Sequence, residues 1–286
     1  MVDKLPCRTF ELKPFTVNYA ETGSGDTLLF LHCSSGNYRE WLPQITVFRE
    51  HYHILAPDLL GYGKTSPWPK VLPDDVPTDG KLLEHLLTLA TGQVHIIGHS
   101  FGGAVALEAV RNLVAQKSNP VTSMMLIEPV AFHILKENNE KEAKRIDAIA
   151  RCCIRHLHNG NLEKAAAVYM GYWLGKMKWM FAPKKFRAGV VRSIAKVAHE
   201  FGSIPNYTAM AEDYRSINIP VTLVQGNKTT NAAKAMNQIL MNKLPNSQSL
   251  TLPGAGHLSP YTHPKEITSA LEKHLAFSSR SGMTSI

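Results

Sequence analysis

The sequence predicts an α/β protein with a mostly parallel central sheet, helices on both faces and one helical insertion. Three observations lead to this prediction. Short β-rich runs alternate with helical stretches along most of the 286 residues, and parallel strands need such long connections between them. The alternation stops between residues 137 and 213, where the pattern is helical, and then resumes. The composition, 44% hydrophobic and 19% charged, is typical of a globular protein.

The elements before the insertion follow one another at short intervals. β-branched and aromatic runs predict the strands, and apolar residues at helical spacing predict the helices. Turn-forming Gly23-Ser24-Gly25-Asp26 separates the first two strands, and a Pro-rich connection occupies residues 66–77. In chain order we expect a strand over 16–20, a strand over 27–32, a helix over 41–48, a strand over 53–57, a helix over 81–90, a strand over 94–97, a helix over 102–114 and a strand over 121–127.

The helical stretch divides the expected architecture in two. Residues 1–131 and 214–286 are expected to form the core domain, and residues 132–213 a helical cap. Ligands of open α/β sheets bind at the carboxyl edge of the strands, so we expect the cap to cover that edge. After it we expect a strand over 219–225, a helix over 231–244, a strand over 249–252, a helix over 264–276 and a frayed C-terminal tail.

One short motif predicts the chemistry. Gly98-His99-Ser100-Phe101-Gly102 fits the pattern G-x-S-x-G and lies between a predicted strand and a predicted helix. In such a tight turn the neighbouring chain crowds the positions two before and two after the serine, which explains the glycine at both. The dipole of the following helix favours negative charge at the serine. The motif therefore predicts that Ser100 is a nucleophile.

Four motifs, in this order along the chain, resemble those of the α/β-hydrolase family. They are His32-Cys33-Ser34-Ser35-Gly36, Pro57-Asp58-Leu59-Leu60-Gly61-Tyr62-Gly63, Gly98-His99-Ser100-Phe101-Gly102-Gly103 and Gly254-Ala255-Gly256-His257. The resemblance covers nearly the whole chain and is weakest in the cap. It implies that His257 is the general base, which takes the proton of Ser100 and returns it to the leaving group.

The resemblance also implies an oxyanion hole made of two backbone N–H groups. One belongs to Phe101, directly after the nucleophile, and by family position the other belongs to Ser34. Relatives usually have glycine where this sequence has Cys33. Because the donor is main chain, we expect this change to alter the shape of the pocket more than its chemistry. A nucleophilic Cys33 is the alternative interpretation.

The acid that should orient His257 is not in its usual place. Most relatives have an aspartate shortly after the strand that corresponds to residues 219–225, but residues 226–231 contain no carboxylate. Glu128 directly follows the preceding strand, and some α/β-hydrolases, haloalkane dehalogenases among them, take their acid from the end of this strand. The two strand ends are adjacent, so a glutamate there should reach the same imidazole. We therefore predict Glu128 as the acid.

These residues together predict acyl transfer. We expect a serine hydrolase that cleaves a small or medium apolar carboxylic ester through an acyl-enzyme, without a metal or an organic cofactor. The Met-rich and aromatic stretch 169–180 is expected to contribute Trp173 and Met177 to an apolar pocket beside Cys33, with ordinary packing as the alternative.

Two other classes of function stay open. The first is another cofactor-free reaction of this family, such as that of a C–C hydrolase, a lyase or a perhydrolase. The second is a non-catalytic receptor for a small molecule, because the conventional aspartate is missing.

The charge balance gives no clear indication of a macromolecular partner. There are 31 Lys and Arg against 23 Asp and Glu, for a net charge of +8. The clusters 176–178 and 184–187 are interpreted as a solvated helical face rather than as a nucleic-acid or lipid-binding surface. The N-terminus lacks the pattern of a signal peptide and no long apolar span occurs, so we expect a cytoplasmic protein without membrane insertion. The four cysteines are not expected to form disulfides, and the oligomeric state stays open.

Overall fold

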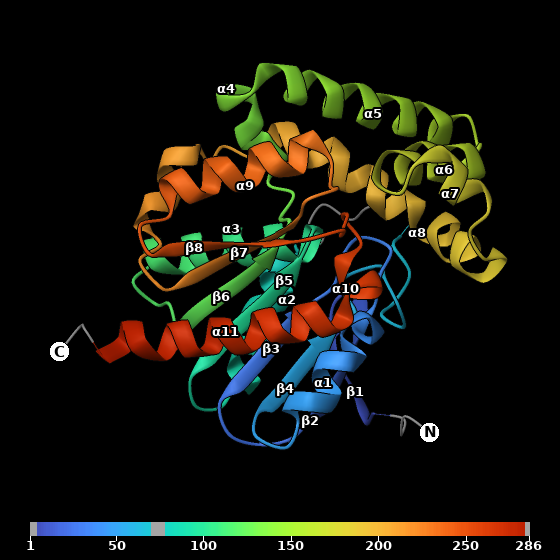
Figure 1. Ribbon diagram of the computed structural model, residues 1–286. Helices are drawn as coiled ribbons and strands as arrows, with labels where there is room; N and C mark the ends of the chain where they lie inside the picture. Colours follow the sequence, from blue (N-terminus) through green and yellow to red (C-terminus); the bar gives the residue numbers. More distant parts are fainter. Residues whose placement is uncertain (1–4, 70–77, 284–286) are drawn as a thin grey trace.

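A computed structural model describes residues 5–69 and 78–283 of the chain. Its centre is one eight-stranded sheet in the order β1-β2-β4-β3-β5-β6-β7-β8 (Figure 1). The β1–β2 and β2–β4 pairs are antiparallel, and the strands from β4 to β8 are all parallel to their neighbours. The strands are β1 Cys7–Leu12, β2 Phe15–Thr22, β3 Thr27–Leu31, β4 His53–Pro57, β5 Val94–His99, β6 Val121–Ile127, β7 Val221–Gly226 and β8 Ser247–Leu252.

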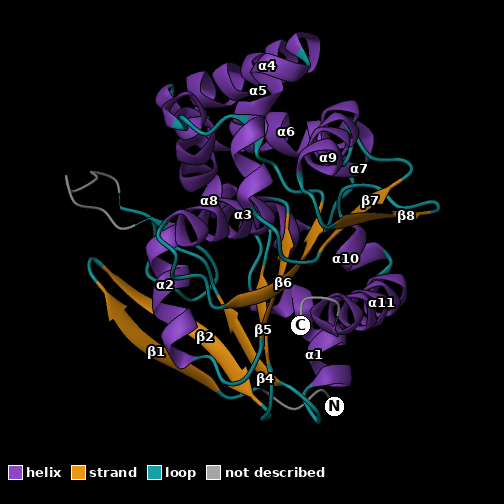
Figure 2. Ribbon diagram, turned by 90° about the vertical axis from the view of Figure 1, so that its left-hand side faces the viewer, coloured by secondary structure: helices purple, strands orange, loops and turns teal. Residues whose placement is uncertain are grey.

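The central strands are mostly apolar and are buried along their whole length, since helices cover both faces of the sheet. β3, β4 and β5 are buried at every position, as expected for a parallel sheet between two layers. Figure 2 shows α1 and α11 on one side of the sheet and α2 and α3 on the other. These covering helices are α1 Leu42–Phe48, α2 Asp79–Leu89, α3 Phe101–Ala115, α9 Asn231–Lys243 and α11 Pro264–Met283, with the short α10 Ser259–Thr262 before the last of them.

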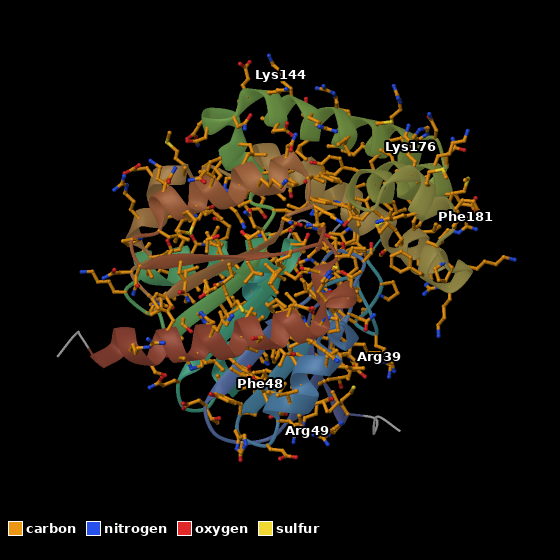
Figure 3. All side chains as sticks on the ribbon, in the orientation of Figure 1. Arg39, Phe48, Arg49, Lys144, Lys176 and Phe181 are labelled. Carbon is orange, nitrogen blue, oxygen red and sulfur yellow. The ribbon has the colours of Figure 1, made fainter. Side chains whose placement is uncertain are left out.

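A helical insertion separates β6 from β7, as predicted. Its helices are α4 Leu135–Asn138, α5 Glu140–His158, α6 Leu162–Trp173, α7 Lys176–Met180 and α8 Lys184–Ser203. Short 3₁₀ helices occur in the connections, namely η1 Tyr38–Trp41, η2 Phe132–Ile134, η3 Ile204–Asn206 and η4 Ala211–Ser216. Lys144 and Lys176 point away from the body on the outer side of the insertion (Figure 3).

The order of strands and helices is as predicted, with two corrections. β1 was not predicted, because this edge strand is largely exposed and only Phe10 and Leu12 pack against the core. The expected frayed tail is wrong, since α11 continues as far as Met283. Most of the Pro-rich connection, residues 70–77, lies outside the described residues.

Within the described residues, every helix is either too short or too polar to cross a membrane.

Candidate active site

Ser100 stands at a strained turn between β5 and α3. Its backbone has φ 54° and ψ −116°, a conformation that costs a non-glycine residue about 1–3 kcal/mol. A Cβ atom on Gly98 would lie 2.7 Å from the Cα of Gly103, and one on Gly102 would overlap the carbonyl oxygen of Leu31. Only glycine therefore fits on either side, and the turn presents the serine hydroxyl above the end of the sheet.

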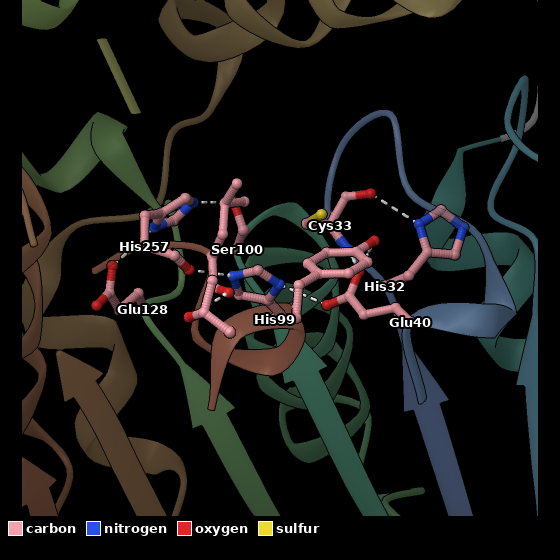
Figure 4. A network of polar contacts seen from close by, with 10 residues as sticks. His32, Cys33, Glu40, His99, Ser100, Glu128 and His257 are labelled. Carbon is pink, nitrogen blue, oxygen red and sulfur yellow. Dashed lines mark hydrogen bonds and ion pairs between the residues drawn. The ribbon is translucent and has the colours of Figure 1, made fainter. Parts of the chain in front are cut away.

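His257 joins the serine from the loop after β8. Its Nε2 lies 2.9 Å from Ser100 Oγ, and its Nδ1 lies 2.7 Å from Oε2 of Glu128 (Figure 4). A carboxylate only accepts hydrogen bonds, so Nδ1 carries the proton and Nε2 is free to accept the serine proton. Burial lowers the pKa of His257 below its ordinary value, and Glu128 only partly offsets this. The imidazole is thus neutral in the resting state.

Glu128 follows β6 directly and has a positive φ of 45°. Besides His257 it accepts hydrogen bonds from the Gly226 N–H at 2.8 Å and from the Thr229 hydroxyl at 2.5 Å. Burial alone would raise its pKa, but the hydrogen bonds and the facing imidazole outweigh burial and lower it. The carboxylate therefore stays ionised, and β6 and β7 are adjacent in the sheet as the sequence argument required.

A second buried carboxylate, Glu40, lies under this site and was not predicted. Its Oε1 is 2.5 Å from Nδ1 of His99, while Nε2 of His99 is 2.8 Å from the His257 carbonyl oxygen. Because both nitrogens face acceptors, His99 is an imidazolium. Burial would lower its pKa, but Glu40 outweighs this and raises it. In the sequence, Glu40 is one polar residue in a helical stretch, and nothing there indicates burial.

Glu40 also holds the loop after β3. Its Oε2 accepts hydrogen bonds from the Cys33 N–H at 3.1 Å and from the Tyr261 hydroxyl at 3.0 Å. Cys33, Glu40 and His99 bring three potential metal ligands within 4.8 Å of one another. These hydrogen bonds already satisfy both carboxylate oxygens, and burial raises the pKa of the Cys33 thiol well above its ordinary value. The cluster is thus suited to a structural role, and Cys33 is poorly suited to be a nucleophile.

The two residues predicted to supply the oxyanion donors lie beside the same cavity as Ser100. Phe101 is the first residue of α3, where backbone N–H groups have no partner within the helix. Ser34 lies in the loop after β3, and the next residue, Ser35, has a positive φ of 64°. Ser34 and Phe101 line the same cavity as Ser100.

This cavity lies between the core and the insertion and has a volume of about 60 Å³. Most of its wall is apolar, formed by residues such as Phe101, Val105, Phe132, Val197 and Phe201. Glu200 of α8 is a polar exception that the sequence did not predict. Burial raises its pKa to about 7, partly against the nearby Lys196 ammonium.

The three predicted substrate-binding residues have different surroundings. Trp173 stacks on the His257 ring, with centroids 3.6 Å apart, and lines the cavity at Ser100. Cys33 lines a small neighbouring cavity of about 20 Å³, which Trp173 and His257 also line. The prediction for Met177 is wrong, because this side chain is 67% exposed on α7 and is absent from the lining of both cavities. The prediction assumed one helix through Trp173 and Met177. In the structure α6 ends at Trp173 and α7 begins at Lys176, after Gly175.

Comparison with known proteins agrees with this architecture. A hydrolase from Acinetobacter baylyi, named (E)-2-((N-methylformamido)methylene)succinate hydrolase, is 20% identical over 274 residues, which is 91% of this chain and 94% of that protein. Lipase 1 from Psychrobacter immobilis is 32% identical over 120 residues, 40% of this chain and 35% of the lipase. The structure of a thermophilic esterase from Thermogutta terrifontis superposes with a TM-score of 0.70 at 21% identity, covering 96% of this chain and 99% of the esterase.

The model of the alpha/beta hydrolase family matches residues 28–270, from β3 into the last helix. This match spans all four motifs that surround Ser100 and His257, and the chain belongs to the alpha/beta hydrolase family.

Proposed function

We propose that the protein is a serine hydrolase that cleaves a small or medium apolar carboxylic ester, with Ser100 as nucleophile, His257 as general base and Glu128 as the orienting acid. The observation that carries this proposal is the continuous hydrogen-bonded chain from Ser100 through His257 to Glu128. A hydroxyl, a neutral imidazole and an ionised carboxylate in this order form the arrangement that activates a serine.

In the first half of the reaction, Ser100 Oγ attacks the ester carbonyl carbon while its proton passes to His257 Nε2. The new imidazolium is stabilised by the carboxylate of Glu128. The carbonyl oxygen becomes an oxyanion and accepts hydrogen bonds from the N–H groups of Phe101 and Ser34. His257 then returns the proton to the departing alkoxide, which leaves as an alcohol, and the acyl group stays on Ser100.

In the second half, His257 takes a proton from a water molecule, and the resulting hydroxide attacks the acyl carbonyl. A second tetrahedral intermediate forms in the same oxyanion hole. Its collapse releases the carboxylic acid and returns the proton to Ser100. Trp173, stacked on the imidazole, keeps bulk water from one face of the base.

The lining of the cavities supports the substrate class. The mostly apolar wall at Ser100 suits an apolar acyl group. The smaller cavity beside His257 lies where a leaving alcohol would receive its proton. We assign Trp173 to the boundary between the two, because it lines both.

Labelling with a fluorophosphonate and turnover of p-nitrophenyl esters test this proposal. The wild-type protein should be labelled at Ser100 and should hydrolyse esters of two to eight acyl carbons, and Ser100→Ala should do neither. If the folded protein is not labelled, a receptor function replaces the proposal. If it is labelled but hydrolyses no ester, another reaction of the family replaces it.

A further inference from the structure

Large apolar side chains are exposed at the corner formed by α7 and the start of α8. They are Met177 at 67%, Met180 at 55%, Phe181 at 76% and Phe186 at 39%. A single exposed apolar side chain needs no explanation, but four within ten residues form a patch. We call these four side chains the corner patch.

Positive charge surrounds the corner patch, and the exposed apolar side chains among these lysines lead us to revise the sequence-based interpretation of the two clusters as a solvated face. Lys176, Lys178, Lys184 and Lys185 are all exposed, and residues 176–187 contain no acidic residue. Figure 3 shows Lys176 and Phe181 at this corner, both pointing away from the body. An apolar centre with a lysine rim matches an anionic lipid surface, where the apolar groups enter the acyl boundary and the ammonium groups meet phosphates.

The corner patch also borders the proposed active site. Phe186 lines the cavity that contains His257, and its ring packs edge-on against the buried Trp179, with centroids 6.1 Å apart. We propose that the protein docks on anionic membrane surfaces through the corner patch. The docking proposal does not depend on the proposed function. Entry of an ester into the site from this surface does rest on it.

Sedimentation with phospholipid vesicles tests the docking. Ser100→Ala protein should be retained on phosphatidylglycerol-containing vesicles at least about tenfold more than on phosphatidylcholine vesicles, and high salt should reduce the retention. Met180→Ser/Phe181→Ser in this background should lose it, while Val47→Ser, which changes a side chain 49% exposed on α1, should keep it. The same pair of substitutions in the active protein should leave hydrolysis of a soluble ester unchanged.

Absence of retention on anionic vesicles, or equal retention of the double variant, overturns the docking proposal. Self-association that the double variant abolishes, without vesicle binding, assigns the patch to a second copy of the chain and also overturns it. Each of these outcomes is independent of fluorophosphonate labelling, so the vesicle experiment and the labelling experiment test the two proposals separately.

A different observation concerns the loop that carries Ser34. Helix α8 holds this loop through two side chains that are seven residues apart on one helix face. The Ser34 hydroxyl donates to Oε2 of Glu200 at 2.6 Å, and Ser193 Oγ donates to Ser35 Oγ at 2.8 Å. The other oxygen of Glu200 accepts a hydrogen bond from the Tyr62 hydroxyl, also at 2.6 Å.

Burying the Glu200 carboxyl costs free energy. A hydrophobic residue at this position would fill the same part of the cavity wall without that cost. The Lys196 ammonium, 3.8 Å away, only partly offsets that cost, because it pairs more closely with Asp79 at 2.8 Å. In this position the Glu200 carboxylate holds the loop at Ser34, and the residue after Ser34, Ser35, has a positive φ. We infer that Glu200 is a positioning residue, which fixes the direction of the Ser34 backbone N–H toward the oxyanion; this inference rests on the proposed function.

Steady-state kinetics of four variants test the role of Glu200. Glu200→Ala should lower kcat about tenfold to a hundredfold with KM nearly unchanged, because a misdirected donor weakens the transition state only. Ser34→Ala, which keeps the N–H but removes the anchor, should match it, and the double variant should be no slower than either. Glu200→Gln should restore most of kcat, since its amide can bond both hydroxyls. Arg192→Ala, exposed on the same helix, is the control.

Affinity for a trifluoromethyl ketone, whose adduct fills the oxyanion hole, should fall in parallel with kcat. Additive losses in the double variant, or a change confined to KM, overturn the inference. If Glu200→Ala does not fold, Ser34→Ala and Ser193→Ala test the same anchor. A wild-type protein that is neither labelled nor active refutes the proposed function instead.

Discussion

At the scale of single residues, the proposed mechanism requires Glu128 to fix the tautomer of His257 that can accept the Ser100 proton. A glutamine at position 128 has the same shape, but its amide can donate to Nδ1 and so stabilise the tautomer whose Nε2 carries the proton. That tautomer cannot accept the serine proton. We expect Glu128→Gln to lower kcat by about 10³–10⁴-fold while the unfolding midpoint changes little, as measured by ester turnover and urea denaturation.

Thr229→Ala is the matched control, because it removes one of the hydrogen bonds to the Glu128 carboxylate and keeps its charge. We expect a loss of no more than about tenfold from this change. Near-normal turnover by Glu128→Gln would show that another group orients His257.

If His257 is the general base, as we propose, its charge state should set the pH dependence of the reaction. The base must be neutral, and its pKa lies below the ordinary histidine value of about 6.5. Log kcat/KM should therefore be flat near pH 7.5 and fall with unit slope only below pH 6.5, as His257 gains a proton. Glu200→Gln separates any contribution from the Glu200 carboxyl, whose pKa is about 7. An acid limb above pH 7 that persists in this variant would contradict the assignment.

At the scale of elements, the same substitution should have opposite effects in two helices. A Cβ on Gly102, in the first turn of α3, would overlap backbone atoms of the strand end at Leu31. Gly189, inside α8, has only the flexible Arg192 side chain nearby, at 3.9 Å. In urea unfolding, Gly102→Ala should cost about 1–3 kcal/mol, and Gly189→Ala should add about 0.5–1 kcal/mol. Equal effects at both positions would show that crowding does not explain the glycine at 102.

The elements differ in how far the sequence determines them. The elbow around Ser100 was predictable because glycine at 98 and 102 has a steric cause that acts within a few residues of the turn. Glu128 was predictable because neighbouring strands end at the same edge. Glu40 and Glu200 were not, since Glu40 meets His99, and Glu200 meets Ser34, across more than fifty residues. Their local patterns resemble those of ordinary surface carboxylates. For Met177 the prediction relied too much on local spacing, because it extended the helical period of Trp173 across the break at Gly175.

At the scale of the whole molecule, a chain of polar side chains links the sheet to α11. His274 is buried and lies 2.8 Å from Ser123 of β6 and 2.8 Å from Thr222 of β7, and Ser123 also lies 2.7 Å from Nδ1 of His95 on β5. The last helix is thus tied to three adjacent strands on the face opposite α3. The helix over 264–276 was predicted from its periodicity, but its hydrogen bonds to the strands were not, because such long-range contacts cannot be read from a local pattern.

The buried histidine in this group of side chains should make the folding stability depend on pH. Burial, together with the nearby His95, lowers the pKa of His274 to about 3, whereas an unfolded histidine titrates near 6.5. Between these values the unfolded chain binds a proton that the folded chain excludes. The contribution of His274 is therefore fully present above pH 6.5 and is lost as the pH falls toward 3, by up to about 1.4 kcal/mol per pH unit. His99, whose pKa is raised, acts in the opposite direction and favours folding below pH 6.5.

Urea unfolding from pH 7.5 to 4 should show a shallower fall in stability for His274→Gln than for the wild-type protein. The exposed His51→Gln should retain the wild-type slope, and an equal slope in all three proteins would mean that His274 is protonated within the fold.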